Sequence, residues 1–214
     1  LDPASGWHAN EAGTYLQRDL PETSAQLEAD SRWPAFFPSP TCLVTTTNGK
    51  EVGFEKVVGP SIVNRFPYIA ALSFCRQTLS KRHHRRGRFA KLLEAGRSVA
   101  IQFLTPGEQL ATAIKVIAET PEEKTSERLN LARLKTRPGQ TVEAPVINNA
   151  YLVYEGKLVK PSKDFFGNAI YEKAWADVGS HRVYFIEITA IQLRKDIAEG
   201  KSQIHWQGLP EWSP

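Results

Sequence analysis

The residues best suited to chemistry follow an apolar run in the first half of the chain. Residues Tyr68 to Phe74 form a continuous apolar stretch of strand length. Arg76, Thr78 and Ser80 come directly after it, where a basic helix is predicted from Ser80 to Ala95. A helix start offers free N–H groups and a positive dipole end, and arginine adds a fork of donors. This junction therefore predicts a phosphate-binding site. For most of the run KRHHRRGR, a solvated basic helix face is the alternative.

The overall charge favours a small anionic ligand over a nucleic acid. The 214 residues include 27 Lys and Arg against 23 Asp and Glu, a net charge of +4, and much of the positive charge lies between Arg76 and Arg97. A long polyanion usually needs a wide basic face, and the sequence contains no recognisable nucleic-acid-binding module. We therefore expect no nucleic-acid partner.

The sequence indicates no metal site, disulfide framework or membrane span. Cys42 and Cys75 lie far apart without CxxC spacing, and no HExxH motif or Cys/His cluster exists. There is no run of about 18 apolar residues and no signal-peptide pattern. These features predict a cytoplasmic protein without a membrane partner. The sequence contains no methionine, even at position 1, so we expect that it does not begin at the biosynthetic start.

The rest of the chain predicts mostly strands, with helices in the middle. Asn48-Gly49 is a two-residue hairpin signal, because both turn positions need a positive φ. Thr105 and Thr120 each precede a proline and stand three residues before a Glu, which predicts two helices capped by these threonines. Further strands are expected at 42–47, 98–104, 150–160 and 182–193, with a short helix after residue 21. This order predicts a mainly β protein, a β-barrel with helical insertions.

Four segments, in this order, resemble the flavin reductase-like family of FMN-binding split barrels. They are PSPTCLVTT, the strand at 68–74 running into Arg76, EAPVINNAYLVYEGKL and GSHRVYFIEI. The resemblance covers residues 38 to 194. It implies a Greek-key-like split barrel at 38–196, preceded by an N-terminal extension at 1–37 with a short helix and followed by a C-terminal tail at 197–214.

The resemblance also implies a function. Members of this family are homodimers that hold FMN near the dimer interface. They use NADH or NADPH to reduce flavin, or pass electrons to a partner. We therefore expect a homodimeric FMN-binding flavoprotein, either an NAD(P)H:flavin oxidoreductase or a carrier for FMN-mediated electron transfer. Its partner would be a flavin-dependent oxygenase or another electron acceptor.

The family's site residues can be carried over to matching positions. His181 corresponds to the His of the family's Gly-Asp-His segment, beside the flavin and its hydride donor, and is the expected catalytic residue. Thr78, Ser80, Lys81 and Arg82 are expected around the phosphate. The residues expected to line the isoalloxazine and ribityl chain are Gly59, Pro60, Ser61, Ile62, Val63, Asn64, Ser73, Phe74, Cys75 and Arg76.

This chain departs from the family pattern in ways that motivate alternatives. Ser180 stands where the family has Asp, and bulky Ile186 stands where it has a small Gly. Both changes would crowd or depolarise the place of the hydride donor. The non-catalytic alternative is a flavin or haem carrier, or a cofactor-less split barrel. A second enzyme alternative is a flavin-dependent reductase of a small organic substrate. For His181, a structural role at a strand start also stays open.

Overall fold

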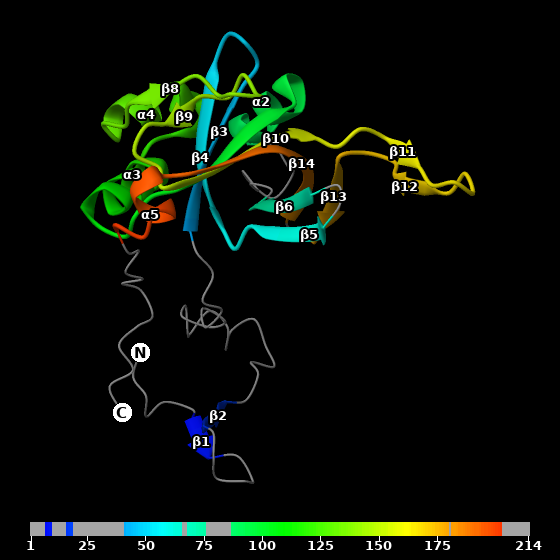
Figure 1. The fold of residues 1–214 in the computed structure, drawn as a ribbon, viewed down its shortest axis with the longest axis horizontal. Helices are drawn as coiled ribbons and strands as arrows, with labels where there is room; N and C mark the ends of the chain where they lie inside the picture. The colour runs from blue at the N-terminus through cyan, green and yellow to red at the C-terminus, as the bar shows by residue number, and fades with distance from the viewer. Residues whose placement is uncertain are drawn as a thin grey trace. The chain divides into compact units, whose positions relative to one another are not determined.

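A curled antiparallel sheet is the main feature of the chain (Figure 1). The computed structural model describes residues 7–9, 16–18, 41–65, 68–75, 87–179 and 181–202. The chain divides into two compact units, one of residues 1–38 with 206–214 and one of residues 39–205. The first unit contains a hairpin of β1 (Trp7–Ala9) and β2 (Leu16–Arg18). The short helix predicted after residue 21 lies outside the described residues.

The second unit contains an eight-stranded sheet in the order β4-β3-β7-β10-β14-β6-β5, with β13 also paired to β14. Every pairing is antiparallel. The strands are β3 (Thr41–Thr47), β4 (Val52–Val58), β5 (Ser61–Arg65), β6 (Tyr68–Cys75), β7 (Ser98–Phe103), β10 (Leu152–Leu158), β13 (Trp175–Val178) and β14 (His181–Leu193).

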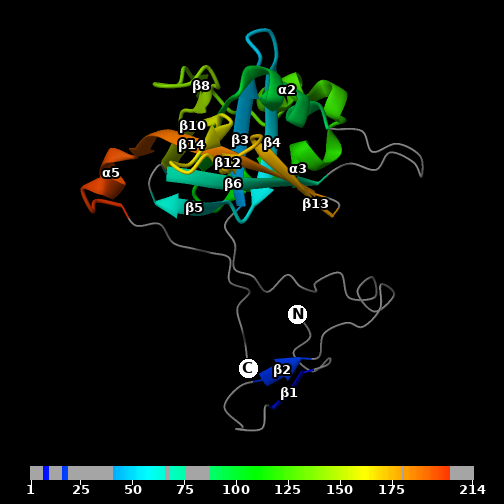
Figure 2. The ribbon, with the colours of Figure 1, turned by 90° about the vertical axis from the view of Figure 1, so that its right-hand side faces the viewer.

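Short hairpins and helices complete this unit (Figure 2). The short strand pairs are β8 (Thr136–Arg137) with β9 (Val146–Ile147), and β11 (Ser162–Lys163) with β12 (Ala169–Tyr171). The helices are α2 (Arg88–Gly96), α3 (Glu108–Glu119), the 3₁₀ helix η1 (Glu122–Glu127), α4 (Arg128–Leu131) and α5 (Lys195–Ala198). Helices α2, α3 and η1 all contact β4.

The sheet curls because the inner faces of its two halves share one core. Val44 and Ile101, from β3 and β7, belong to the same buried cluster as Leu72 of β6 and Tyr184 of β14. The prediction of a mainly β split barrel with helical insertions is therefore confirmed.

The prediction that strand β6 is buried on both faces is wrong, because Tyr68 and Ser73 are exposed.

The predicted helix boundaries need correction. Phe89, Leu92 and Leu93 form the buried stripe of α2 as predicted. The helix begins at Arg88 rather than Ser80, because Gly87 before it has an extended ψ of 155°. Residues 76–86 lie outside the described part.

The predicted turn and cap chemistry is also wrong in detail. Helices α3 and η1 are preceded by Gly107 and Pro121 and have no side-chain cap from either threonine. The hairpin of β3 and β4 exists, but Thr47 pairs with Val52, so the connection is longer than two residues. Within it, only Gly49 has a positive φ.

The outer face of β3, β7 and β10 is covered by segment 140–147, which buried polar side chains hold in place. Gln102 of β7 accepts a hydrogen bond from the backbone N–H of Ile147. The carboxylate of Glu155, on β10, accepts the backbone N–H groups of Gln140 at 2.9 Å and Thr141 at 2.6 Å. Burial raises the pKa of Glu155, but these donors outweigh burial and hold the pKa below its usual range. The carboxylate therefore stays charged and keeps the segment on the sheet.

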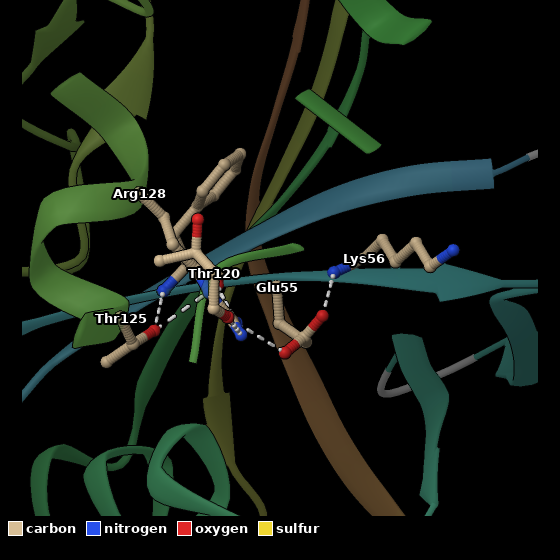
Figure 3. Close-up of polar contacts among 6 residues, drawn as sticks. Glu55, Lys56, Thr120, Thr125 and Arg128 are labelled. Atoms are coloured by element: carbon tan, nitrogen blue, oxygen red, sulfur yellow. Dashed lines mark hydrogen bonds and ion pairs between the residues drawn. The ribbon is translucent and has the colours of Figure 1, made fainter. Parts of the chain in front are cut away.

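Arg128 joins the helical insertion to strand β4 (Figure 3). Its guanidinium is buried and donates to the Glu55 carboxylate at 2.8 Å and to the Phe54 carbonyl at 3.2 Å. It also donates to the Thr120 carbonyl, at the end of α3, at 2.7 Å. Thr125 of η1 accepts the Phe54 N–H at 3.2 Å. The insertion is therefore fixed to the sheet by polar contacts as well as by apolar packing.

Ile186 and Gly156 form a close contact inside the barrel. Ile186 is fully buried, and it lies between Leu158 of β10 and Ala70 of β6 in the sheet register. A Cβ atom on Gly156 would lie 2.5 Å from Ile186 Cγ2 and 2.7 Å from the Glu187 carbonyl oxygen. Only glycine leaves enough room for this isoleucine.

Replacing Gly156 by Ala is expected to lower the free energy of unfolding by about 1–3 kcal/mol, because the added methyl overpacks this contact. Chemical denaturation measures the change. In an Ile186→Ala background the same replacement should cost less, since one of the two clashes is gone. An equal cost in both backgrounds would contradict this account of the contact.

Candidate functional site

The ends of β5, β6 and β14 meet at one edge of the sheet. The end of β6 lies beside the start of β14, with Cys75 opposite His181. On the other side of β6, the start of β5 pairs with it, with Ser61 opposite Ala71. Gly59, in the turn before β5, has a φ of +67°, a left-handed conformation that favours glycine. This edge brings together parts of three segments that the sequence indicated for cofactor binding.

The predicted cofactor-binding segment 59–64 lies only partly at this edge. Asn64 pairs with Ile69, near the start of β6. At ~3.3 Å per residue, Ile69 is about 13 Å along the strand from Ser73. Residues 59–61 therefore lie near the end of β6, whereas Asn64 lies near the start of that strand.

The outer surface at this edge carries small and polar side chains. Ser61 and Ser73 are exposed, and Ala71 on the same face is half-buried. His181 is exposed at the first position of β14. Ser61, Ala71 and Ser73 leave space for a flat ligand, next to the ring of Phe185, which lies opposite Ala71 in the register.

Several predicted site residues are only partly covered by the structure. For some of them the backbone is described but the side chain is not; these are Ile62, Val63, Asn64 and Cys75. Others lie entirely outside the described residues; these are Arg76, Thr78, Ser80, Lys81 and Arg82, together with Ser180. Their predicted roles stay predictions.

A small apolar hollow lies beside the start of β5. Pro60, Ser61, Ala70, Phe103 and Tyr154 line it with Ile101, and its volume is about 100 Å³. Sites that enclose drug-sized ligands measure roughly 300–1,000 Å³. The hollow alone is therefore too small to enclose a three-ring flavin.

A cluster of charged and aromatic side chains lies at the start of β14. The guanidinium of Arg182 contacts the carboxylates of Glu94 on α2 at 2.9 Å and Asp177 on β13 at 2.6 Å. The guanidinium carbon lies 5.2 Å from the ring centre of Trp175. The Tyr184 hydroxyl donates to Glu94 at 2.8 Å. Helix α2 is thus tied to two strands beside the candidate site.

The charges of this cluster are stabilised by their partners. Hydrogen bonding to Asp177, together with that to Glu94, holds the pKa of Arg182 above its usual value. Burial and the hydrogen bond to Glu94 raise the pKa of the Tyr184 phenol, so it remains a donor. Sequence reasoning missed this cluster, because Glu94 and Arg182 are 88 positions apart. The available signal was the alternation of Arg182 and Tyr184 along one strand.

Phe74 belongs to the core rather than to the outer surface. Its ring centre lies 5.0 Å from that of Phe89 on α2 and 5.8 Å from that of Tyr184. The ring therefore fixes the end of β6 against the helix.

The described part of the chain contains neither a reactive thiol nor a metal-binding cluster. Cys42 is buried, and burial raises the pKa of its thiol to about 12. Among residues 41–65, 68–75, 87–179 and 181–202, no cluster of His, Cys, Asp or Glu is arranged to hold a metal ion. No helix of the described segments is long and apolar enough to span a membrane.

Solved structures of related fold are similar to the chain at low identity. An NADH:FAD oxidoreductase of Streptomyces globisporus C-1027 matches with a TM-score of 0.60 and 16% identity over 83% of this chain and 87% of that chain. An FMN-binding protein from Thermus thermophilus matches with a TM-score of 0.58 and 14% identity over 88% and 83%. A putative flavin reductase from Haemophilus somnus 129pt matches with a TM-score of 0.58 and 13% identity over 81% and 90%.

No curated protein sequence matches the chain. The family model of the flavin reductase like domain matches residues 35–209, most of the chain. The match includes the four segments whose order suggested this family. The chain belongs to the flavin reductase-like domain family.

Proposed function

We propose that this protein binds FMN and catalyses the reduction of flavin by NADH or NADPH. The observation that carries the proposal is the meeting of Gly59–Ser61, Ser73–Cys75 and His181 at one exposed edge of a flavin reductase-like barrel. The oxidoreductase and FMN-binding names of similarly folded proteins support the proposal. Reduced flavin, or electrons from it, would pass to a flavin-dependent oxygenase or another acceptor in the cytoplasm.

The residues at the edge fit a flat cofactor. When bound, a flavin supplies the hydride-accepting chemistry, and the protein supplies binding, orientation and local charge. The small side chains of Ser61, Ala71 and Ser73 allow a ring to approach the backbone. The backbone N–H groups around the Gly59 turn offer donors for polar ring atoms. His181, exposed at the start of β14, is the side chain we assign to the nicotinamide side.

The packing of Ile186 favours the enzyme over the non-catalytic alternative. Ile186 was expected to crowd the hydride donor, but its side chain is fully buried and fills the space beside Gly156. An isoleucine inside the barrel does not stand on the outer surface of β6 and β14, where the hydride donor was expected. This removes one of the two reasons for proposing a carrier or a cofactor-less barrel.

We further propose that the protein is a homodimer whose partner subunit covers the outer surface of the site. The hairpin of β11 and β12 projects from the sheet (Figure 1), and it exposes Phe165 by 97% and Phe166 by 84%. Val178, beside the candidate site on β13, is 60% exposed. Exposed apolar side chains of this kind are common at protein interfaces.

Analytical ultracentrifugation at micromolar concentration is expected to give twice the chain mass of 23.9 kDa. Replacing both Phe165 and Phe166 by Ser should shift the protein towards the monomer without unfolding it, because both rings are solvent-exposed. A wild-type protein that sediments as a monomer at all tested concentrations would contradict the dimer.

Flavin binding and turnover test the proposed function directly. The purified protein is expected to retain a visible flavin band after incubation with FMN and desalting, or to oxidise NADH or NADPH when free FMN or FAD is added. His181→Ala should lower kcat for nicotinamide oxidation more than it lowers FMN affinity. A protein that neither retains flavin nor oxidises either nicotinamide would exclude the enzyme and favour the cofactor-less barrel.

A further inference from the structure

The hairpin of β11 and β12 ends in an ordered turn that exposes two aromatic rings. The backbone N–H of Asp164 donates to the Asn168 carbonyl at 2.8 Å, and the Asn168 N–H donates to the Asp164 carboxylate at 2.8 Å. Gly167, with a φ of +83°, donates its N–H to the Asp164 carbonyl at 3.1 Å. These bonds fix the turn, from which Phe165 and Phe166 project with 97% and 84% of their surface exposed.

The two rings form one apolar group, here called the aromatic tip. The ring centres of Phe165 and Phe166 lie 5.6 Å apart in an edge-to-face arrangement. Single apolar side chains are common on protein surfaces, but two adjacent aromatic rings on an ordered projecting turn are not explained in this way. The aromatic tip therefore indicates a surface that binds a partner.

The hollow beside the start of β5 matches the chemistry of a phenyl ring. Six uncharged residues line it: Pro60, Ser61, Ala70, Ile101, Phe103 and Tyr154. Its volume is about 100 Å³. An apolar cavity of about 150 Å³ accepts a whole benzene molecule. A phenylalanine ring entering from outside can therefore fill this hollow, with the base of the side chain at its rim.

Apolar side chains continue beyond the hollow on the inner face of the sheet. Tyr154, in the wall of the hollow, lies between Ile101 of β7 and Ile191 of β14 in the register. Ile191 is 55% exposed, and Leu193, two residues further on the same face, is 47% exposed. In the described strands, the pairing of β6 with β14 runs no further than Glu187. A second aromatic ring can therefore lie on this surface beside the hollow.

We propose that the aromatic tip of one subunit enters the hollow of a second copy of this chain, with Phe165 inside it and Phe166 on the adjoining apolar surface. The inference rests on the proposed homodimer and adds the contact that joins the two subunits. Two-fold symmetry makes the contact reciprocal. An aromatic side chain seated in a pocket is a common anchor of protein interfaces. Because Ser61 belongs to both the hollow and the candidate flavin edge, the inserted ring lies beside the flavin site.

Dimer dissociation constants of full-length variants, measured by analytical ultracentrifugation, test the inference. Phe165→Ser is expected to raise the dissociation constant about 10-fold or more, as for an interface anchor. Ala70→Leu fills the hollow from its inner wall and should have a similar effect. Adding Phe165→Ser to Ala70→Leu should then raise the constant no further. Leu131→Ser is the matched control, because this side chain on α4 is 53% exposed and should not affect dimerisation.

Disulfide trapping locates the contact without depending on how a core variant folds. Phe165→Cys combined with Ser61→Cys, at the wall of the hollow, should give a covalent dimer on a non-reducing gel after mild oxidation. Each single variant should remain a monomer on the gel. Phe165→Cys combined with Leu131→Cys is the control pair and should also give no covalent dimer.

The possible results separate this inference from the proposals on which it rests. Weaker dimerisation in Phe165→Ser, together with trapping of the pair at positions 165 and 61, supports it. Wild-type dimerisation in Phe165→Ser overturns it and leaves the homodimer in place. Additive effects of Phe165→Ser and Ala70→Leu overturn the hollow as the receiving site. A wild-type monomer overturns the homodimer and this inference together, whereas the flavin assays judge the enzyme separately.

Discussion

The structure depends on the packing of β14 inside the curled sheet. This strand pairs with β10 along one half and with β6 along the other, and Ile186 lies where the two pairings meet. The isoleucine fits only because Gly156 has no side chain. Core interiors are packed nearly as densely as organic crystals, so a residue that fills this space fixes the distance between strands. The same strand carries His181 at its start, so this contact and the candidate site share one strand.

The inner and outer faces of β6 and β14 have different roles. Inner side chains such as Leu72 and Tyr184 are fully buried and supply the apolar core. Outer positions such as Ser73 remain exposed. Arg182 lies on the same side of β14 as Tyr184, and its ion pair with Glu94 is largely shielded from water. An edge with small outward side chains at Ser61, Ala71 and Ser73 is a suitable surface for a flat cofactor.

Patterns local in sequence predicted the elements, whereas contacts between distant residues were not predictable. The strands at 42–47, 68–74 and 182–193 were recognisable because β-branched and apolar runs are a local property. The buried stripe of α2 followed from helical periodicity. The prediction of threonine caps was wrong, because each helix begins later than the spacing suggested, after Gly107 and after Pro121. The family resemblance implied that residues 59–64, residues 73–76 and His181 all lie beside one flavin. The Glu94–Arg182 ion pair was not predicted, because its two residues are far apart in the sequence.

The most direct test of the account is hydrogen–deuterium exchange of the protein with and without saturating FMN, followed by mass spectrometry of peptides. The account predicts that FMN slows exchange in peptides covering Gly59–Ser61, residues 73–82 and His181–Val183, and leaves the α3–α4 insertion unchanged. Protection confined to the insertion, or absent from all three strand ends, would contradict the assignment of the flavin site.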